Sequence, residues 1–453
     1  MKWAFFDCYK LYKQGVSVME KEIKGNGFAL IPLGIFILLF IGTAVVTKDF
    51  YSMPVVLASL IAAGVALAMN RKENFMKKVE VFCRGAGNSN IILMILVFLL
   101  AGAFAETAKK IGAVDSIVNL GISLLPASLL VVGLFLIGCF ISISMGTSMG
   151  TIVALAPIGI GIAEQTGISV ALTLSAVIGG AMFGDNLSMI SDTTIAAVRT
   201  QNTKMKDKFK VNFFIVLPAA IITAIIYGFL TMGEKAAIDG GKSFEFITVL
   251  PYLGVLIAAI VGVNVLIVLV SGTLFAGVVG LFNGTFGVSG LVSTVTDGIK
   301  GMEDLAMIAL IIGGMIEVIR YNGGVQYVLD KILNRVKSRK GAEFGIAGLA
   351  TILDLSTANN TISIIMGGPL AKNISLEYHV DARKSASILD IFSGSVQGML
   401  PYGAQLLAAA GLASISPLAL IPYSIYPLLT AVAGIIAISI NYPSFRKETT
   451  VEE

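Results

Sequence analysis

The sequence predicts an all-α polytopic membrane protein, organised as two related halves that each contain interrupted helices. Three observations predict this class: an apolar composition, long uncharged runs and an internal repeat. Of the 453 residues, 56% are hydrophobic and 13% are charged, and the mean hydropathy is +0.88. A soluble domain usually carries about 25% charged residues. The composition therefore favours a protein whose outer surface faces lipid.

The apolar residues are gathered into runs that carry almost no charge. A helix needs roughly 20 apolar residues to cross the ~30 Å hydrocarbon core of a bilayer. Shorter apolar pieces lie between the long runs, so we expect about a dozen spanning or half-spanning elements. The long runs are residues 28–47, 53–69, 90–105, 116–143, 211–232, 246–270 and 417–440.

The rest of the composition excludes several classes of protein. Three scattered cysteines and a single histidine predict neither a disulfide framework nor a cysteine- or histidine-rich metal centre. The net charge of +4 requires no nucleic-acid partner, because basic cytoplasmic loops would give the same sign. The sequence has no glycine-rich nucleotide loop, which disfavours ATP-driven pumping. We expect a transporter without enzymatic activity or a prosthetic cofactor.

Two short basic segments predict the orientation of the N-terminal part. Residues 10–24 carry four lysines and residues 71–84 carry five basic residues, with two apolar runs between them. The positive-inside rule places both segments on the cytoplasmic side. We expect a multi-pass protein of a bacterial cytoplasmic membrane, in contact with lipid, and a homodimer is compatible with the sequence.

An internal repeat is the strongest organisational feature. Residues 100–114 (LAGAFAETAKKIGAV) resemble residues 311–325 (IIGGMIEVIRYNGGV) at an offset of 211. Residues 146–157 (GTSMGTIVALAP) resemble residues 358–369 (ANNTISIIMGGP) at an offset of 212. Two blocks that agree within one residue predict a duplication, which is the usual plan of secondary transporters and often has inverted topology.

The repeat predicts how the chain is divided. The predicted parts are an N-terminal segment with two transmembrane helices (1–89), a first repeat (90–232), connecting helices (233–301), a second repeat (302–441) and a polar C-terminal tail (442–453).

Polar segments interrupt the apolar pattern twice in each half. Residues 145–152 and 183–194 in the first half correspond to residues 356–363 and 396–405 in the second. Non-helical backbone at membrane depth is tolerated only when it is buried in protein or lines a wet cavity. A helix broken there presents carbonyl groups at one half-helix end and N–H groups at the other, which suit a cation and an anion respectively.

Asp185 and Asp192 are the strongest candidates for ion binding. Serine, threonine and asparagine surround them with the hard oxygen ligands that suit Na⁺. A carboxylate inside a membrane is costly and is usually functional. Burial favours its protonated form and a bound cation favours its ionised form, so one group can exchange H⁺ for Na⁺. The alternative is a surface loop in which both residues act as turn or N-cap residues.

Asn359, Asn360 and Thr361 form the corresponding polar centre of the second half. Adjacent amides between apolar runs are expensive in lipid unless they are partnered, so we interpret them as a ligand-binding turn, with a helix-capping turn as the alternative. The repeat register places Gln397 opposite Asp185. We therefore expect the charged side chains of the site to come from the first half.

Two further carboxylates, Asp354 and Asp390, have two interpretations each. Asp354 just before the second-half turn is either an ion ligand or a helix cap. Asp390 lies in an apolar run and either binds an ion or pairs with Arg383 or Lys384.

Glu106 and Glu317 are matched by the repeat. Each precedes basic residues, Lys109 and Lys110 in the first half and Arg320 in the second. This spacing predicts an ion pair near the membrane interface, and a role in ion binding is the alternative.

The interrupted segments resemble those of a known family. FGDNLSMISDTT (residues 183–194), with its Arg-Thr-Gln continuation at 199–201, resembles the signature of the NhaC-type Na⁺/H⁺ antiporter family, within the ion-transporter superfamily of secondary transporters. STANNTIS (residues 356–363) is similar to the Ser-Asn-Thr turns of that superfamily. Met189 differs from the signature of that family, because many members have proline at this position.

The resemblance implies two inverted repeats, each with a re-entrant hairpin and an interrupted helix, and a transport domain that moves against a scaffold. It also implies that Na⁺ is held at Asp185, Asn186 and Asp192. The site residues that it implies are Asp185, Asn186, Ser188, Ser191, Asp192 and Thr193 in the first half, Thr147 and Ser148 at the first hairpin tip, and Asn359, Asn360 and Thr361 at the second tip.

We therefore expect Na⁺/H⁺ exchange, with Na⁺ and H⁺ as the transported or coupling ions. The alternative is Na⁺- or H⁺-coupled transport of a small organic solute such as an amino acid or a carboxylate. Two polar hairpin tips offer more hydrogen-bonding groups than a bare cation requires, which favours that alternative. A channel or a membrane receptor is a third class, which a duplicated pair of broken helices fits less well.

Overall fold

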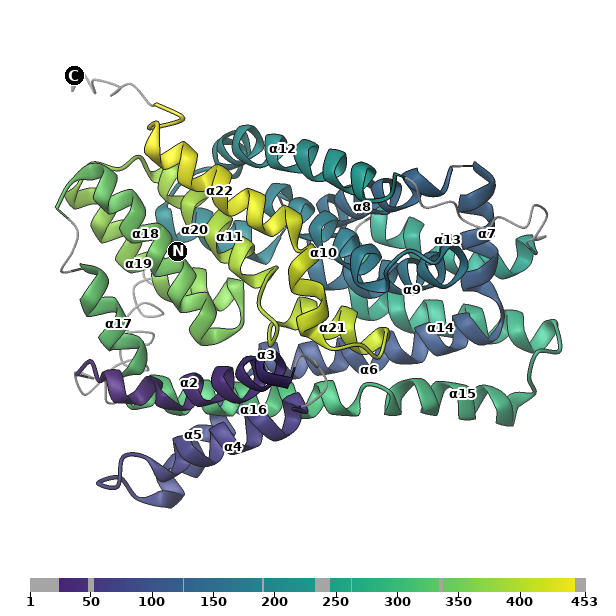
Figure 1. Ribbon diagram of the computed structural model, residues 1–453, viewed down its shortest axis with the longest axis horizontal. Helices are drawn as coiled ribbons and strands as arrows, with labels where there is room; N and C mark the ends of the chain where they lie inside the picture. Colours follow the sequence, from purple (N-terminus) through teal and green to yellow (C-terminus); the bar gives the residue numbers. More distant parts are fainter. Residues whose placement is uncertain are drawn as a thin grey trace, which may run out of the picture.

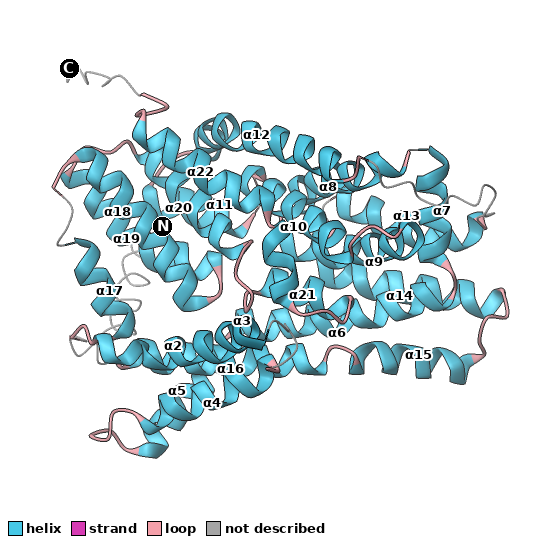
Figure 2. Cartoon of the chain, in the orientation of Figure 1, coloured by secondary structure: helices cyan, strands magenta, loops and turns pink. Residues whose placement is uncertain are grey.

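The computed structural model describes residues 24–47, 53–124, 126–189, 191–232, 245–261, 263–333 and 337–444. Within these ranges the chain consists of helices and connecting loops and contains no strand (Figure 2). The all-α class expected from the composition is confirmed.

The first half of the chain contains a helical hairpin followed by a broken helix. Before the hairpin are η1 (Gly27–Leu30), α2 (Ile31–Ile37), η2 (Leu38–Gly42), α3 (Thr43–Thr47), α4 (Val55–Ala68), α5 (Phe75–Ala86), α6 (Ser89–Lys110) and α7 (Ala113–Leu124). The hairpin, the broken helix and the helix that follows are α8 (Ala127–Met145), α9 (Ser148–Thr166), α10 (Val170–Leu187), α11 (Asp192–Gln201) and α12 (Met205–Leu230).

The second half also contains a helical hairpin followed by a broken helix. The connecting helices are α13 (Phe246–Ile260), α14 (Val265–Phe282) and α15 (Val288–Lys300), and the second half begins with α16 (Glu303–Tyr321) and α17 (Gly324–Leu333). The hairpin, the broken helix and the last helices are α18 (Arg339–Thr357), α19 (Asn360–Glu377), α20 (Ala382–Gln397), α21 (Ala404–Leu412), η3 (Pro417–Tyr423) and α22 (Ile425–Ser439). An inverted relation between the halves stays a prediction.

Five of the described helical segments are long and apolar enough to cross a membrane, and a sixth span is possible if a bent pair is counted. The bent pair is α21 with η3, which meet at 109°. The five segments are Ile91–Lys110, Ser148–Thr166, Val170–Gln201, Met205–Leu230 and Val265–Phe282. Further apolar helices are shorter, as expected for half-spanning elements.

Three of the apolar runs are divided between two helices. The run at 116–143 is split at Pro126, which precedes α8 with an extended backbone. The run at 246–270 is split where the side chain of Asn264 caps α14, and the run at 417–440 divides at Ser424. Proline and capping residues end helices whatever the hydropathy of their neighbours, so hydropathy alone overestimated the length of these elements.

The two hairpin tips have matching backbone conformations. Gly146 ends α8 in the left-handed region with φ 71°, and Ala358 ends α18 there with φ 50°. The next residues, Thr147 and Asn359, are both extended, with φ −149° and −151°. Each tip therefore reverses the chain within two residues and directs the N-terminus of the second hairpin helix toward the interior.

Close helix packing relies on glycine contacts between helices that are far apart in the chain. A Cβ at Gly102 on α6 would lie 2.2 Å from the Gly298 carbonyl oxygen on α15. A Cβ at Gly85 on α5 would lie 2.5 Å from the Gly313 carbonyl oxygen on α16. Small residues of this kind let membrane helices approach closely. Figure 1 shows α6 and α15 side by side, and α5 against α16.

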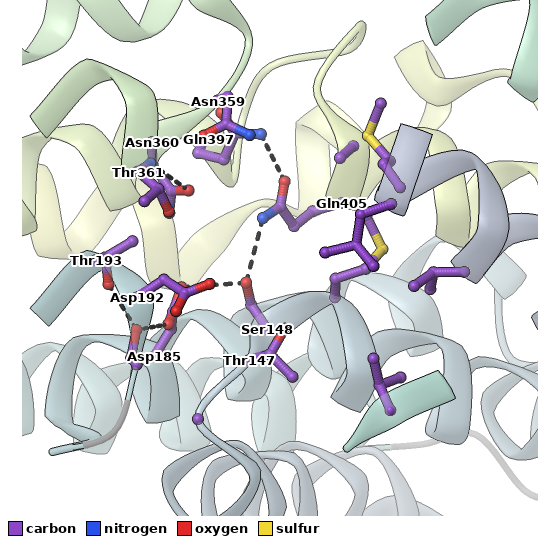
Figure 3. A pocket seen from close by; sticks show the side chains of 18 residues that line it. Thr147, Ser148, Asp185, Asp192, Thr193, Asn359, Asn360, Thr361, Gln397 and Gln405 are labelled. Carbon is purple, nitrogen blue, oxygen red and sulfur yellow. Dashed lines mark hydrogen bonds between the residues drawn. The ribbon is translucent and has the colours of Figure 1, made fainter. Parts of the chain in front are cut away.

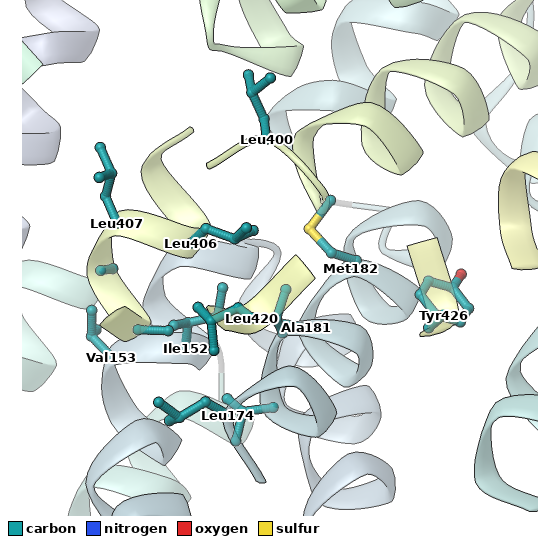
Figure 4. Packing of buried hydrophobic residues seen from close by; sticks show 14 of the residues in the cluster. Ile152, Val153, Leu174, Ala181, Met182, Leu400, Leu406, Leu407, Leu420 and Tyr426 are labelled. Carbon is teal, nitrogen blue, oxygen red and sulfur yellow. The ribbon is translucent and has the colours of Figure 1, made fainter. Parts of the chain in front are cut away.

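The second half contributes part of the core around the first-half hairpin. Helix α21 packs against α9, and η3 packs against α10. Figure 4 shows this cluster, in which Leu406 and Leu420 lie close to Ile152 and Leu174. This packing brings the start of α21 next to the tip of the α8–α9 hairpin and so positions the candidate site.

Candidate functional site

A cavity of about 140 Å³ lies where the two hairpin tips and the two helix breaks meet (Figure 3). Four helices, α9, α11, α19 and α21, begin at residues that line it: Ser148, Asp192, Asn360 and Ala404. The lining residues are Leu93, Met94, Val97, Gly146, Thr147, Ser148, Met149, Asp185, Ser191, Asp192, Thr193, Val265, Asn359, Asn360, Thr361, Gln397, Ala404 and Gln405.

Asp185 is the buried carboxylate of this cavity, with 6% of its surface exposed. Ser148 Oγ donates a hydrogen bond to Oδ2 over 3.1 Å, and Ser191 Oγ donates a short one to Oδ1. The hydroxyls of Ser191 and Thr193 are 2.7 Å apart. Within the described chain no lysine or arginine forms an ion pair with Asp185. The side-chain hydrogen bonds that this carboxylate receives within the described chain therefore come from hydroxyl groups.

A chain of hydrogen bonds joins Asp185 to the second half of the protein. Gln405 Nε2 donates to Ser148 Oγ over 3.2 Å, and Gln397 Nε2 donates to Gln405 Oε1 over 2.6 Å. Gln397 Nε2 also donates to the Ala358 carbonyl oxygen over 3.2 Å. Gln405 was not singled out from the sequence. The signal available was its place at the end of the polar segment 396–405, where a buried amide is expensive without a partner.

The other cavity residues divide between the two halves. Asp192 begins α11 and is exposed, and Thr147 lies half-buried at the first hairpin tip. At the second tip Asn359 Oδ1 accepts from the Ile362 N–H over 2.9 Å and Asn360 Oδ1 accepts from the Thr361 N–H over 3.0 Å. The second-half amides therefore cap α19 and line the cavity as well.

Asn186 and Ser188 are not brought to the cavity. The Asn186 side chain donates to the Tyr426 hydroxyl over 3.2 Å, away from the lining residues. Ser188 Oγ donates to the Ile143 carbonyl oxygen over 2.9 Å and ties the end of α10 to α8. Of the three residues predicted to hold Na⁺, the structure brings together Asp185 and Asp192 only.

Asp390 is ion-paired with a lysine that sequence reasoning did not select. Lys208 Nζ lies 2.7 Å from Asp390 Oδ2. Neither Arg383 nor Lys384 is its partner, because Arg383 pairs with Asp381 and Lys384 pairs with Glu343. Lys208 belongs to a basic stretch that resembles a cytoplasmic loop, but it lies in the first turn of α12 and faces α20.

The remaining carboxylates have separate environments. Asp354 is fully buried, and neither of its carboxylate oxygens has a hydrogen-bond partner among the described residues, so it is not a side-chain cap. Arg320 Nη1 lies 3.3 Å from Glu317 Oε2, which confirms the predicted ion pair of the second half. Glu106 is half-buried, and within the described chain it forms no ion pair with Lys109 or Lys110.

The residues of the cavity suit a hard cation better than a transition metal. No group of three or more histidine, cysteine, aspartate or glutamate side chains gathers as a metal site in the described part of the chain. The cavity offers two carboxylates together with hydroxyl and amide oxygens. Oxygen ligands of this kind are preferred by hard cations.

Comparison with known proteins identifies the family. The family model described as "Na+/H+ antiporter family" matches residues 27–232 and 243–443. The Malate-2H(+)/Na(+)-lactate antiporter of Bacillus subtilis (strain 168) is 23% identical, over 87% of this chain and 90% of that protein. The Na(+)/H(+) antiporter NhaC of Alkalihalophilus pseudofirmus is 24% identical, over 93% of this chain and 98% of that protein.

A third relative is named for amino-acid substrates. The Arginine/ornithine antiporter ArcD of Halobacterium salinarum is 22% identical, over 77% of this chain and 78% of that protein. These relatives are all secondary transporters by name, and the family model covers most of the chain. This multi-pass membrane protein belongs to the Na⁺/H⁺ antiporter family.

Proposed function

We propose that this protein exchanges Na⁺ for H⁺ across a bacterial cytoplasmic membrane, and that Asp185 alternately carries the two ions. The observation that carries the proposal is the environment of Asp185. It is buried between the two hairpin tips and receives hydrogen bonds from Ser148 and Ser191. An ionised carboxylate in such a place needs a compensating charge, and a bound Na⁺ or a bound proton supplies it.

The arrangement of the cavity supports alternate occupation. Na⁺ would take Asp185 as its buried ligand, with Asp192 as a second negative group at the exposed side. Asn186 contributes to this site through the backbone, because its carbonyl oxygen accepts hydrogen bonds from Lys208 and Asn212 and fixes the end of α10. Since both hairpin tips meet at the cavity, movement of a transport domain that carries both hairpins against the rest of the protein would change access to it.

Proteoliposomes that enclose a pH indicator test the exchange. An inward Na⁺ gradient drives H⁺ outward, so the lumen is expected to become alkaline without any organic solute. Asp185→Asn removes the charge with little change of shape and is expected to abolish this response. Asp297→Asn is the matched control, because Asp297 is an exposed aspartate on α15. An Asp185→Asn variant that exchanges at the rate of the parent protein would remove the central residue of the proposal.

A small carboxylate-bearing solute is the second candidate cargo. The observation that favours it is the convergence of four helix N-termini on the cavity, at Ser148, Asp192, Asn360 and Ala404. Helix N-termini carry partial positive charge and attract anionic groups. Two of the relatives are named for organic substrates: malate and lactate in one name, and arginine and ornithine in the other.

The same vesicles distinguish the two cargoes. Labelled dicarboxylic, hydroxy- and amino acids are added singly, with and without a Na⁺ gradient. Accumulation of one solute that requires Na⁺, together with no lumenal pH change in its absence, would replace ion exchange by solute transport. A pH change that is independent of every solute supports the first proposal.

A further inference from the structure

Asp354 is a fully buried carboxyl group outside the cavity. It lies in the last turn of α18, with no exposed surface, and it is not among the residues that line the cavity at Asp185 or the two cavities that include Pro54 and Pro218. Both of its carboxylate oxygens lack a hydrogen-bond donor among the described residues. This environment differs from that of Asp185, which has two hydroxyl donors.

The other fully buried charges near α18 are paired. Lys208 neutralises Asp390 and Lys384 neutralises Glu343, each at 2.7 Å. An isolated ionised carboxylate in a low-dielectric interior is far more costly than a paired one. Asp354 has no such partner among the described residues. Protonation would remove its negative charge without any further ligand.

The helices packed on α18 supply no charged partner to Asp354. On α20, Arg383 is paired with Asp381, and the hydroxyl of Tyr402 after α20 donates to the Leu355 carbonyl oxygen over 2.8 Å. Helix α22 carries no charged residue. The other charged residues of the packed helices, none of which hydrogen-bonds to Asp354 in the described chain, are Lys372 and Glu377 on α19, Glu303, Asp304, Glu317 and Arg320 on α16, and Asp330 and Lys331 on α17.

Asp354 is nevertheless connected to the cavity. Its carbonyl oxygen accepts from the Ala358 N–H over 2.8 Å, which closes the last turn of α18. The Ala358 carbonyl oxygen accepts from Gln397, and Gln397 is joined through Gln405 and Ser148 to Asp185 (Figure 3). Amides do not readily relay protons, and the chain begins at the backbone of Asp354, so it links the position of Asp354 to the cavity through the second hairpin tip and is not a path for protons.

We propose that Asp354 is a second proton-carrying group, separate from the Na⁺ site at Asp185. In the conformation described here its carboxyl group holds a proton. When the second hairpin tip rearranges and admits water, the carboxyl O–H bond breaks, its electron pair stays on the carboxylate, and the proton passes to water. Each transport cycle then moves one proton more than exchange at Asp185 alone would move.

The inference rests on the proposed Na⁺/H⁺ exchange, and the ratio of transported ions tests it separately. In proteoliposomes whose membrane potential is set by a K⁺ gradient and valinomycin, the potential at which exchange reverses gives the number of H⁺ per Na⁺. Asp354→Asn is expected to lower that number by one, and Asp354→Glu to retain it. A merely structural role would change the rate and leave the ratio unchanged.

An unchanged ratio in an active Asp354→Asn variant would overturn the inference while leaving the exchange proposal intact. Absence of exchange in the unmodified protein would instead overturn the proposed function. If Asp354→Asn does not fold, Asp354→Ser replaces it, since Ser142 occupies the corresponding place in α8 at the offset of 212. Infrared spectra in saturating Na⁺, which keeps Asp185 ionised, supply a second readout: the band of a protonated, buried carboxyl group is expected in the parent protein and absent in the variant, and its persistence contradicts the assignment.

Discussion

Lys208 Nζ and Asp390 Oδ2 lie 2.7 Å apart, and both side chains are 1% exposed. The ammonium group also donates to the Asn186 carbonyl oxygen over 2.8 Å and to Thr194 Oγ1 over 2.7 Å. One lysine therefore binds the end of α10, the start of α11 and the middle of α20. It fixes the break that presents Asp185 to the cavity without entering the cavity itself.

Removal of one partner of this pair is expected to destabilise the protein strongly. Asp390→Asn leaves the Lys208 ammonium buried without its counter-charge, and losses of about 3–5 kcal/mol are typical for such changes. The double variant Lys208→Met with Asp390→Leu is expected to recover part of the loss, because no buried charge remains. Thermal unfolding in detergent, followed by circular dichroism, measures both effects.

The exposed pair Lys77–Glu80 is the control for that experiment. Its atoms are 2.9 Å apart, but the side chains are 43% and 61% exposed. Solvent screens exposed pairs of this kind and they contribute little to stability, so Glu80→Gln should leave unfolding almost unchanged. Equal losses from Asp390→Asn and Glu80→Gln would contradict a structural role for the buried pair.

A methyl group at the α6–α15 contact is expected to separate the two helices. A Cβ at Gly102 would lie 2.2 Å from the backbone oxygen of Gly298, so Gly102→Ala forces the backbones apart and should reduce stability and folded yield. Gly64→Ala in α4 is the control, since a Cβ there meets nothing within 4 Å. In that open position alanine is expected to stabilise the helix by roughly 0.5–1 kcal/mol relative to glycine. Size-exclusion profiles and unfolding temperatures compare the variants, and equal behaviour would contradict the close contact.

Loss of the Gln405 amide is expected to weaken Na⁺ binding without unfolding the protein. Gln405→Met keeps the length of the side chain but removes the bonds to Ser148 and Gln397. Neutral hydrogen bonds contribute about 0.5–1.5 kcal/mol each, so the Na⁺ concentration at half-maximal exchange should rise by up to roughly tenfold per bond lost. Gln326→Met, which breaks an exposed bond to Asp330, is the control. No change in the Na⁺ dependence of Gln405→Met would exclude the amide chain from the site.

Acidification is expected to weaken Na⁺ binding, because a proton and Na⁺ compete for Asp185. The ionised form binds Na⁺ and the protonated form does not, so apparent affinity falls as pH falls. For one competing proton the change is at most about tenfold per pH unit. Exchange rates measured against Na⁺ concentration at several equal internal and external pH values give this slope. An affinity that does not vary with pH would show that the two ions do not share Asp185.

The amino-acid sequence predicted the class of fold and several residues that the structure brings to one cavity. Polar segments between apolar runs are visible in sequence because broken helices need glycine, asparagine and hydroxyl residues. Asp185, Asp192 and Asn360 were found in this way, and all three line the cavity. Gly146 also indicated the turn at the first tip, because glycine permits the left-handed conformation that this residue adopts.

Other features depend on contacts between distant segments, which the pattern of apolar and polar residues along the chain does not indicate. Lys208 looked like part of a basic loop, and only the packing of α12 against α20 shows that it faces Asp390. The direction of Asn186 depends on Tyr426, which is 240 positions away in the chain. The glycine contacts between α5 and α16 and between α15 and α6 also join segments far apart in the chain, so no local pattern of residues indicated them.

Equilibrium binding of radioactive Na⁺ to the purified protein tests the central claim most directly, because it needs neither a membrane gradient nor turnover. The parent protein and the Asp297→Asn control are expected to bind Na⁺ and to release H⁺ as they do so. Asp185→Asn, confirmed as folded by its unfolding transition, is expected to bind no Na⁺ over the same concentrations. Binding by Asp185→Asn with the affinity of the parent protein would contradict the assignment of Asp185 as the residue that holds the transported cation.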